Sequence, residues 1–473
     1  MLRPLLSLIA IVFLLESDSA AGARRPNVLI ICADDMRPDC LAAAGNAAVR
    51  TPTLDRLAAR GVLFRRAVCA YPICVVSRAE MLTGCQAFRV QTPYASGKFN
   101  SELPRWPEAM RAAGYRTFYV GKWHTTGTPT KLGYQATRGL YGSGGGKYPL
   151  TFAVDHRGVP VTGYSGWVFK DDAGKIYPER GVGLTPNISE AFADAAIELV
   201  SEADDRPFFV HVNFTAPHDP RFFPRGYETS YDPAKLSPPA NFAERHPFDH
   251  GNLNGRDEVL LPRPLTPELI RDELAVYYAL IEHMDAQIGR ILAALERGGQ
   301  AENTIIFFTS DHGLAVGSHG LLGKQNMYEH TINVPLIAAG PGIAAGRETA
   351  AQCYLRDLFP TVCELCGIAA PREIDGRSFA AVLKRPEAKG PHDHVIGYFT
   401  DTQRMIRGER YKLIRYPQIG REQLFDVVAD PNELHDLGGE AQSAAIRREL
   451  GDKLSAWLRE HGDPLAAKSS AGR

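Results

Sequence analysis

The sequence carries almost no net charge, because 53 lysines and arginines are matched by 54 aspartates and glutamates over 473 residues. A net charge of -1 gives the chain no general attraction for nucleic acid, so we expect no such partner and only local affinity for anions. The chain shows no internal repeat. Its hydrophobic fraction of 44% supports a full globular core, and its length suits two domains or one large domain with an appendage.

The N-terminal apolar run is too short to cross a bilayer comfortably. It extends from Leu5 to Leu15, whereas a transmembrane helix needs about 20 apolar residues. The run follows Arg3 and precedes small residues at 19–23, a pattern typical of a secretory signal peptide. We therefore predict a signal peptide at 1–23, a secreted or periplasmic mature protein and no stable membrane anchor.

Cysteine is also sparse, with eight residues in the whole chain. Outside the cytosol these could form disulfides, but their connectivity is not readable from the sequence. Cys69 and Cys85 could bridge each other. Cys363 and Cys366 form a C-x-x-C pair without a second half, which argues against a zinc site.

Apolar runs bounded by turn residues predict strands buried on both faces of an α/β sheet. The clearest runs are at 28–32, 115–120, 208–214, 303–309 and 334–339. A long amphipathic helix starts at Thr266 and ends before Gly298, and it leads directly into the run at 303–309. This helix-then-strand step is the crossover of an α/β fold.

The pattern changes beyond about residue 357. A helix is predicted at 357–366, followed by short strand-like stretches at 394–399, 411–416 and 424–426. We predict a catalytic domain at 24–356 and a smaller C-terminal α+β subdomain with an antiparallel sheet at 357–473. The Gly-, Tyr- and Pro-rich stretch at 127–183 is predicted to be a substrate-facing insertion.

Ionisable side chains follow four of the predicted strands. Two adjacent carboxylates repel each other unless a cation or hydrogen-bond donors compensate them, and the carboxyl edge of an open α/β sheet is where ligands bind. For each pair alone, a solvated turn or surface position is the simpler interpretation. Their convergence at one edge favours a single functional site. The residues are Asp34, Asp35, Lys122, His124, His218, Asp311 and His312.

A segment of its own carries Cys74 and Arg78, separated by Val-Val-Ser and followed by Leu82-Thr83-Gly84. In a helix the arginine would lie about one turn from the cysteine, on the same side. Taken alone, such a cysteine is more often a small buried hydrophobe. The partner motifs elsewhere in the chain change that interpretation.

Together these motifs resemble the type I, formylglycine-dependent sulfatase family of the alkaline phosphatase superfamily. The resemblance covers nearly the whole mature chain, from Arg-Pro-Asn-Val through Ala-Asp-Asp, Gly-Lys-Trp-His, Ala-Pro-His and Ser-Asp-His-Gly to Tyr-Lys-Leu-Ile and Leu-Phe-Asp. The longer motif at 310–320 is similar to glycan sulfatases of the iduronate-2-sulfatase type. The implied fold is an alkaline-phosphatase-like α/β sandwich with a large mixed central sheet and a small C-terminal antiparallel sheet.

The resemblance also implies the chemistry of the site. Cys74 would stay unpaired and be oxidised by a formylglycine-generating enzyme to an aldehyde, whose hydrate attacks sulfur. One calcium ion would be held by Asp34, Asp35, Asp311, His312 and the modified Cys74, since oxygen-rich ligands favour a hard ion. The histidine in this set slightly softens that preference.

The remaining residues would handle charge and protons. By the resemblance, Arg78 and Lys122 would stabilise the formylglycine hydroxyl, and Lys324 would neutralise the sulfate. His218 is the first candidate to protonate the departing alcohol, with Lys324 second. His124 would take the proton of the second hydroxyl when sulfate is released. The expected activity is sulfatase action on a sulfated sugar or polysaccharide.

Val76 is a departure, because the family usually has Pro or Ala two residues after the cysteine. A β-branched residue permits the extended peptide that the oxidising enzyme reads without enforcing it. Two alternatives therefore stay open: a phosphate or phosphonate ester hydrolase of the same fold, and an unmodified, inactive sulfated-glycan-binding protein. The loops at 127–183 and 221–264 would decide the sugar and the sulfated position. Oligomeric state is not readable.

Overall fold

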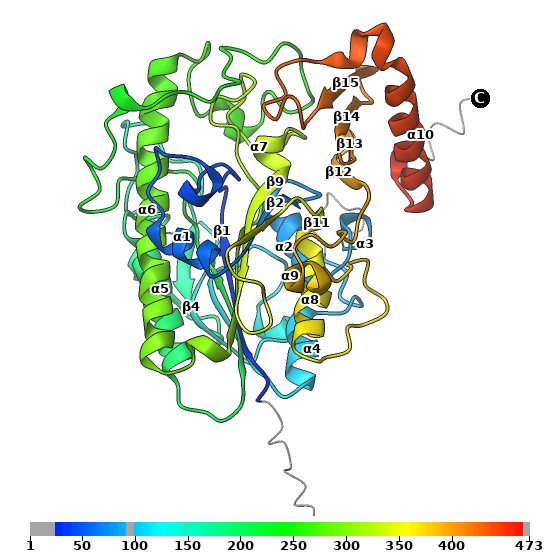
Figure 1. The fold of residues 1–473 in the computed structure, drawn as a ribbon. Helices are drawn as coiled ribbons and strands as arrows, with labels where there is room; N and C mark the ends of the chain where they lie inside the picture. The colour runs from blue at the N-terminus through cyan, green and yellow to red at the C-terminus, as the bar shows by residue number, and fades with distance from the viewer. Residues whose placement is uncertain (1–23, 91–98, 147, 467–473) are drawn as a thin grey trace, which may run out of the picture.

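The computed structural model describes residues 24–90, 99–146 and 148–466, so the predicted signal peptide lies outside the described residues. The described chain forms a mixed sheet of 11 strands with helices on both faces, and a separate four-stranded antiparallel sheet beside it (Figure 1). This confirms the predicted fold class of a large mixed α/β sheet with a small antiparallel one.

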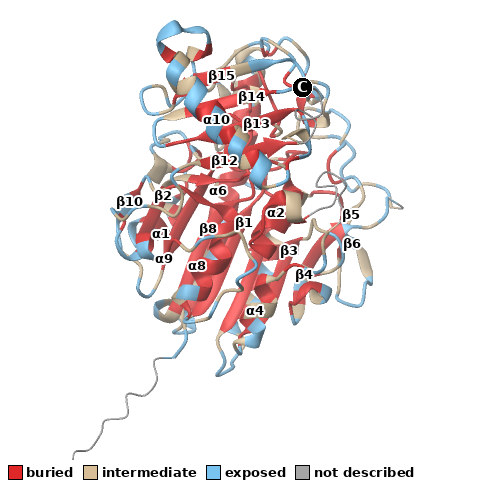
Figure 2. Ribbon diagram, turned by 90° about the vertical axis from the view of Figure 1, so that its right-hand side faces the viewer, coloured by how far each residue is buried: buried red, intermediate tan, exposed pale blue. Residues whose placement is uncertain are grey.

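The centre of the large sheet is parallel and completely buried (Figure 2). Strand β1 (Asn27–Ala33) lies between β7 (Phe208–Asn213) and β8 (Thr304–Ser310), and β3 (Arg116–Lys122) pairs with β7. Strands covered on both faces need continuous apolar runs, which is why these segments are visible in the sequence. Because the strands are parallel, their carboxyl ends meet at one edge.

Antiparallel strands complete one side of this sheet. β9 (Asn333–Ala339) pairs with β8 and with β2 (Gly61–Val68), and both pairs are antiparallel. Two short strands, β10 (Arg347–Thr349) and β11 (Cys353–Tyr354), pair with β2. The antiparallel pairs make the sheet mixed.

The strands on the other side of the large sheet show that the prediction for residues 127–183 was incomplete. This stretch is not simply an insertion loop, because it contains β4 (Ala136–Ser143), β5 (Trp167–Lys170) and β6 (Ile176–Val182), which extend the sheet beyond β3. Glycines in β4 and β6 interrupt the side-chain pattern from which strands are predicted. Gly139, for instance, lies in β4 where a Cβ atom would come within 3.1 Å of Ala195.

Two layers of helices cover the large sheet (Figure 1). On one face lie α1 (Pro52–Ala59), α5 (Ile188–Ser201) and α6 (Pro267–Arg297). The other face carries α4 (Trp106–Ala112), α8 (Leu358–Leu365) and α9 (Ala380–Lys384), whose apolar side chains share a core with the sheet. Three further helices are α2 (Cys74–Thr83), α3 (Ala87–Val90) and α7 (Glu329–Ile332).

The small sheet consists of β12 (Val395–Phe399), β13 (Gln403–Arg407), β14 (Tyr411–Tyr416) and β15 (Arg421–Asp426), with α10 (Ala444–Glu460) packed on it. It is joined to the rest of the chain by buried charges. Glu329 in α7 accepts hydrogen bonds from Arg407 Nη1 at 2.5 Å and Lys412 Nζ at 3.1 Å.

All eight cysteines are buried and free, so the predicted bridge between Cys69 and Cys85 is wrong. Cys69 follows β2 and belongs to the sheet core, whereas Cys85 follows α2 and packs in a separate apolar cluster. The intervening helix keeps the two thiols in different surroundings. Among the described helices, none combines the length and the hydropathy that crossing a membrane requires.

Candidate active site

The ionisable residues predicted at the strand ends meet at the carboxyl edge of the large sheet. Asp34 and Asp35 follow β1, Lys122 is the last residue of β3, and Asp311 and His312 follow β8. His218 lies in the segment after β7, and Cys74 is the first residue of α2. The parallel pairing of these strands is the reason for the convergence.

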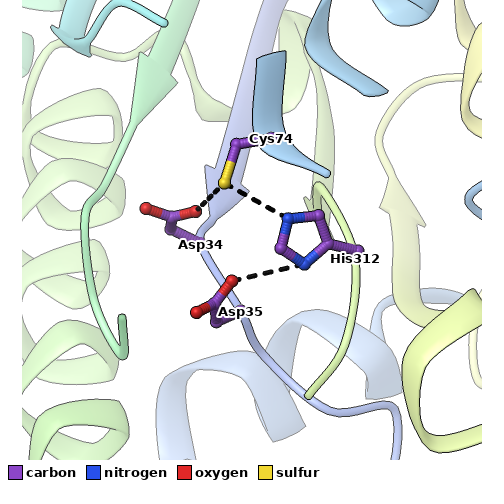
Figure 3. A group of neighbouring side chains, drawn as sticks. All are labelled: Asp34, Asp35, Cys74 and His312. Atoms are coloured by element: carbon purple, nitrogen blue, oxygen red, sulfur yellow. Dashed lines mark hydrogen bonds and ion pairs between the residues drawn. The ribbon is translucent and has the colours of Figure 1, made fainter. Parts of the chain in front are cut away.

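Four side chains form a compact group that could hold a metal ion (Figure 3). Asp34, Asp35, Cys74 and His312 each offer one ligand atom, and these atoms lie within 4.8 Å of one another. Cys74 Sγ is 3.3 Å from both Asp34 Oδ1 and His312 Nε2, and His312 Nδ1 is 3.3 Å from Asp35 Oδ1. Two buried carboxylates beside an imidazole fit a divalent cation, which would offset their mutual repulsion.

Asp35 adopts a backbone conformation that is uncommon for a residue with a side chain. Its φ of 71° lies in the left-handed region, and such strain is concentrated at functional sites. The hydroxyl of Tyr277 donates to the Asp35 carbonyl at 2.5 Å, and the Asp35 amide donates to Asp311 Oδ1 at 3.3 Å. Hydrogen bonds from a helix and from a second strand end thus hold the turn.

Asp311 lies next to the four-residue group, but its carboxylate has other partners. Oδ2 accepts a hydrogen bond from Arg78 Nε at 2.9 Å, and Oδ1 accepts one from the amide of His312 at 3.0 Å. Asp311 is therefore not among the mutually close ligand atoms. Its predicted role as a metal ligand stays a prediction.

Arg78 lies one turn after Cys74 in α2, as the spacing predicts. Its Nη1 donates to Asn213 Oδ1 at 2.6 Å, and its Nη2 lies 3.7 Å from Asp34 Oδ1. Nη2 is buried and has no hydrogen-bond partner among the described residues. The guanidinium therefore keeps one donor available toward the group around Cys74.

Two lysines neutralise the adjacent aspartates. Lys122 Nζ donates to Asp34 Oδ2 at 2.6 Å, and Lys324 Nζ lies 3.1 Å from both carboxylate oxygens of Asp35. Burial raises the pKa of Asp34, but Lys122 and other nearby cations outweigh it and hold that pKa well below its usual range. For Asp35 burial prevails over Lys324, and its pKa rises to about 6.

The two candidate acids, His218 and Lys324, form a hydrogen-bonded pair with Lys324 Nζ 2.8 Å from His218 Nε2. Burial, together with the positive charge of Lys324, lowers the pKa of His218 to about 4. The imidazole is therefore neutral near pH 7, and its Nδ1 lies 3.1 Å from Asp219 Oδ1. This hydrogen bond lets a proton pass between Lys324 Nζ and His218 Nε2.

His124 packs against an aromatic ring, and in the described part of the chain it makes no hydrogen bond to the other predicted residues. Its ring meets the ring of Trp167 edge to face, with centroids 5.0 Å apart, and its buried Nδ1 has no hydrogen-bond partner among the described residues. Burial and the charge of Lys122 lower the pKa of His124 well below its usual range. The ring is therefore neutral, and its unused nitrogen leaves one position open for a hydrogen bond.

Several residues that contact the predicted site residues were not themselves predicted from the sequence. Asn213, at the end of β7, could have been found by the strand-end argument that selected Asp34. Tyr164 donates a hydrogen bond to Asp34 from a glycine-rich stretch without any local signal. Asp257 has no signal either, although it lies 3.6 Å from Lys324 Nζ.

A large mixed α/β sheet that gathers buried carboxylates, a histidine and the first turn of α2 at its carboxyl edge places the chain in the alkaline-phosphatase-like class of folds. Two solved structures share the fold with a TM-score of 0.76 each. One, described as a complex with its substrate D-glucosamine-2-N,6-O-disulfate, is 23% identical and covers 93% of this chain and 99% of that one. The other, a phosphonate monoester hydrolase of Agrobacterium radiobacter, is 25% identical and covers 92% and 96%.

Within this class the chain belongs to the sulfatase family, whose model matches residues 26–368. A second model, described as N-sulphoglucosamine sulphohydrolase, C-terminal, matches residues 317–460. An arylsulfatase of Clostridium perfringens (strain 13 / Type A) is 30% identical over an aligned length of 443 positions, and the alignment covers 87% of this chain and 90% of that relative. The protein is thus an enzyme of the sulfuric ester hydrolase class, and the matches confirm the prediction of a sulfatase.

Proposed function

We propose that the protein removes sulfate from a sulfated carbohydrate, using a formylglycine made from Cys74 and one bound calcium ion. The observation that carries the proposal is the position of Cys74. Its sulfur lies 3.3 Å from Asp34 and His312, at the start of a buried helix that also presents Arg78. A modified side chain there would touch both the cation ligands and the cationic residues.

Asp34, Asp35 and His312 would hold the calcium ion, with Asp311 as the further ligand predicted from the sequence. Carboxylate oxygens predominate in this set, and such ligands suit a hard cation. When bound, the ion would polarise a sulfate oxygen and lower the cost of ionising the attacking hydroxyl. The formylglycine would supply that hydroxyl.

Charge balance in the pocket supports sulfate as the group removed. Five carboxylates face four cationic side chains, which leaves one negative charge before any ion binds. A divalent cation turns this into one positive charge, the complement of a sulfate monoester, whereas a phosphate monoester carries nearly two negative charges near pH 7. The groups are Asp34, Asp35, Asp219, Asp257, Asp311, Arg78, Lys122, Arg256 and Lys324.

The proton steps fall to three side chains. His218, hydrogen-bonded to Lys324, is the first candidate to protonate the leaving alcohol, and Lys324 is the second. Lys324 would also neutralise the sulfate, whereas Arg78 and Lys122 would stabilise the formylglycine hydroxyl. His124 has an unused buried nitrogen and would accept the proton released when the aldehyde is regenerated.

A sugar is the proposed carrier of the sulfate because the family model matching residues 317–460 is described as that of N-sulphoglucosamine sulphohydrolase. The narrower likeness of the 310–320 motif to the iduronate-2-sulfatase type belongs to this proposal as well. Export through the predicted signal peptide at 1–23 would bring the enzyme to sulfated sugars outside the cytosol.

A second candidate is hydrolysis of phosphonate monoesters. It is favoured by the likeness to a phosphonate monoester hydrolase at 25% identity, and such an ester carries a single negative charge like a sulfate monoester. Relative rates on an aryl sulfate, an aryl phosphate and an aryl phosphonate separate the two. Dominance of the phosphorus esters would overturn the sulfatase assignment.

The direct test combines mass spectrometry with turnover. In protein produced together with a formylglycine-generating enzyme, the peptide containing Cys74 should carry an aldehyde in place of the thiol, and Cys74→Ala should abolish sulfate release. Cys85→Ala, at another buried free cysteine, is the matched control and should retain activity. A free thiol at Cys74 with no turnover and retained glycan binding would favour the inactive binding protein instead.

A further inference from the structure

The two carboxylate oxygens of Asp34 have different partners. Oδ1 faces the proposed cation site, 3.3 Å from Cys74 Sγ. Oδ2 points away and accepts hydrogen bonds from Lys122 Nζ at 2.6 Å and from the hydroxyl of Tyr164. The groups that hold Oδ2 therefore decide where Oδ1 points.

Tyr164 is presented to Asp34 by an unusual backbone. Its φ of 55° lies in the left-handed region, which is unfavourable for a residue with a Cβ atom. The preceding Gly163 has no room for a side chain, because a Cβ atom there would lie 2.7 Å from Asp219 Oδ2 and 2.9 Å from Arg256 Nη1. The neighbouring side chains therefore hold Tyr164 in this strained conformation, with its hydroxyl toward Asp34.

The ring of Tyr164 is in contact with several side chains of the site. Its centroid lies 4.7 Å from that of Trp167 and 4.8 Å from that of His218, and Lys122 Nζ lies 5.2 Å from its centre. The residue is 8% exposed. Replacing tyrosine with phenylalanine would keep these ring contacts and remove only the hydrogen bond to Asp34.

We infer that Tyr164 is a positioning residue of the cation site: with Lys122 it fixes Oδ2 of Asp34, so that Oδ1 is held toward the metal ion. An unsupported carboxylate rotates and loses part of its binding geometry. Removal of a hydrogen bond to a ligating side chain typically weakens metal binding by about 10- to 100-fold. The inference rests on the calcium site of the proposed function.

The test is calcium binding to Tyr164→Phe, measured by titration calorimetry and by the calcium-dependent rise in the thermal midpoint of metal-depleted protein. We expect binding about tenfold weaker or more, with the midpoint of the metal-free protein unchanged. Aryl sulfate turnover should fall at low calcium and recover when calcium is raised, because the defect is one of affinity. If Tyr164 were needed only for packing, this variant would show no calcium-dependent defect, because phenylalanine keeps the ring.

Tyr141→Phe is the matched control. Tyr141 is also buried, its ring centroid lies 6.2 Å from that of Tyr164, and its hydroxyl has no hydrogen-bond partner among the described residues. This variant should bind calcium like the wild type.

Three results would overturn the inference. Unchanged calcium affinity in Tyr164→Phe refutes it while leaving the proposed function in place. An equal loss in Tyr141→Phe would show that removing any buried hydroxyl near the site, rather than the hydrogen bond to Asp34, is responsible. A wild-type protein that binds no calcium would refute both the inference and the proposed cation.

Discussion

At the scale of single residues, the surroundings of Cys74 explain why an unmodified thiol is unsuited to the site. The side chain is 2% exposed, and burial beside Asp34 raises the pKa of the thiol well above its usual value. Since the thiolate is the nucleophilic form of cysteine, a neutral buried thiol is unreactive. The position becomes useful when the sulfur is replaced by oxygen, as we propose.

A substitution at His218 tests whether this residue is the general acid. In His218→Ala, release of sulfate from a poor leaving group such as a sugar alcohol should fall by about 10²–10⁴-fold. Aryl sulfates should lose less, because a phenolate leaves without full protonation. Steady-state rates on a series of leaving groups measure the difference. Equal losses across the series would remove His218 as the acid and favour its partner Lys324.

At the scale of elements, helix α1 receives its N-terminal cap from another helix. The side chain of Thr51, the residue before the helix, makes no capping hydrogen bond. Asp285 in α6 instead accepts hydrogen bonds from the amides of Thr53 at 2.9 Å and Leu54 at 2.8 Å. The first-turn amides, which have no partner within the helix, are thereby satisfied across the helix pair.

Asp285→Ala should destabilise the protein by about 1–3 kcal/mol, because two buried amides lose their acceptor. Urea unfolding followed by circular dichroism measures the change. Asp272→Ala, at an exposed position of the same helix, is the control and should stay within about 0.5 kcal/mol of the wild type. Equal stability of the two variants would mean that the cap contributes nothing.

At the scale of the whole molecule, the segment at 246–251 fills the space between the large domain and the small sheet. Phe248 stacks edge to face on Tyr416, with centroids 4.9 Å apart, and His250 Nδ1 is 3.1 Å from Gln403 Nε2. His246 and His250 are 8% and 2% exposed. Burial lowers the pKa of His246 to about 4 and that of His250 to about 3.

The low pKa values of His246 and His250 predict that the folded protein loses stability in acid. In the unfolded chain these histidines protonate near pH 6.5, whereas in the folded protein they stay neutral down to about pH 4, so the unfolded state binds more protons between these values. Stability should therefore fall with decreasing pH in this window, by up to about 1.4 kcal/mol per pH unit and histidine. Thermal midpoints at pH 4 to 7 check this.

The double variant His246→Gln/His250→Gln should show a shallower fall of the midpoint with acidification than the wild type. His435→Gln, whose side chain is 80% exposed, serves as the control and should follow the wild-type slope. A double variant with the wild-type slope would show that other groups control the acid response.

Much of the site followed from the sequence because parallel strands impose a simple rule. The apolar runs that became β1, β7 and β8 predicted a buried sheet, and residues directly after them had to share its carboxyl edge. Asp34, Asp35 and His312 meet there, with Cys74. The roles assigned to these residues stay predictions that the variants above address.

Other features depended on contacts between distant parts of the chain. β13 was not predicted, because three of its five residues are polar and only partners such as Glu329 make burial of Arg407 possible. α10 was missed as well, and the cysteine bridge was wrong.

The sequence by itself determined the buried sheet, the family and the residues that converge on its edge, since these depend on local hydrophobicity and on strand direction. Only the tertiary structure decided that Tyr164 reaches Asp34, that Asp285 caps α1 and that every cysteine is free. Such contacts join residues remote in the chain, and a pairing that arises only when the layers pack leaves no pattern in either segment alone.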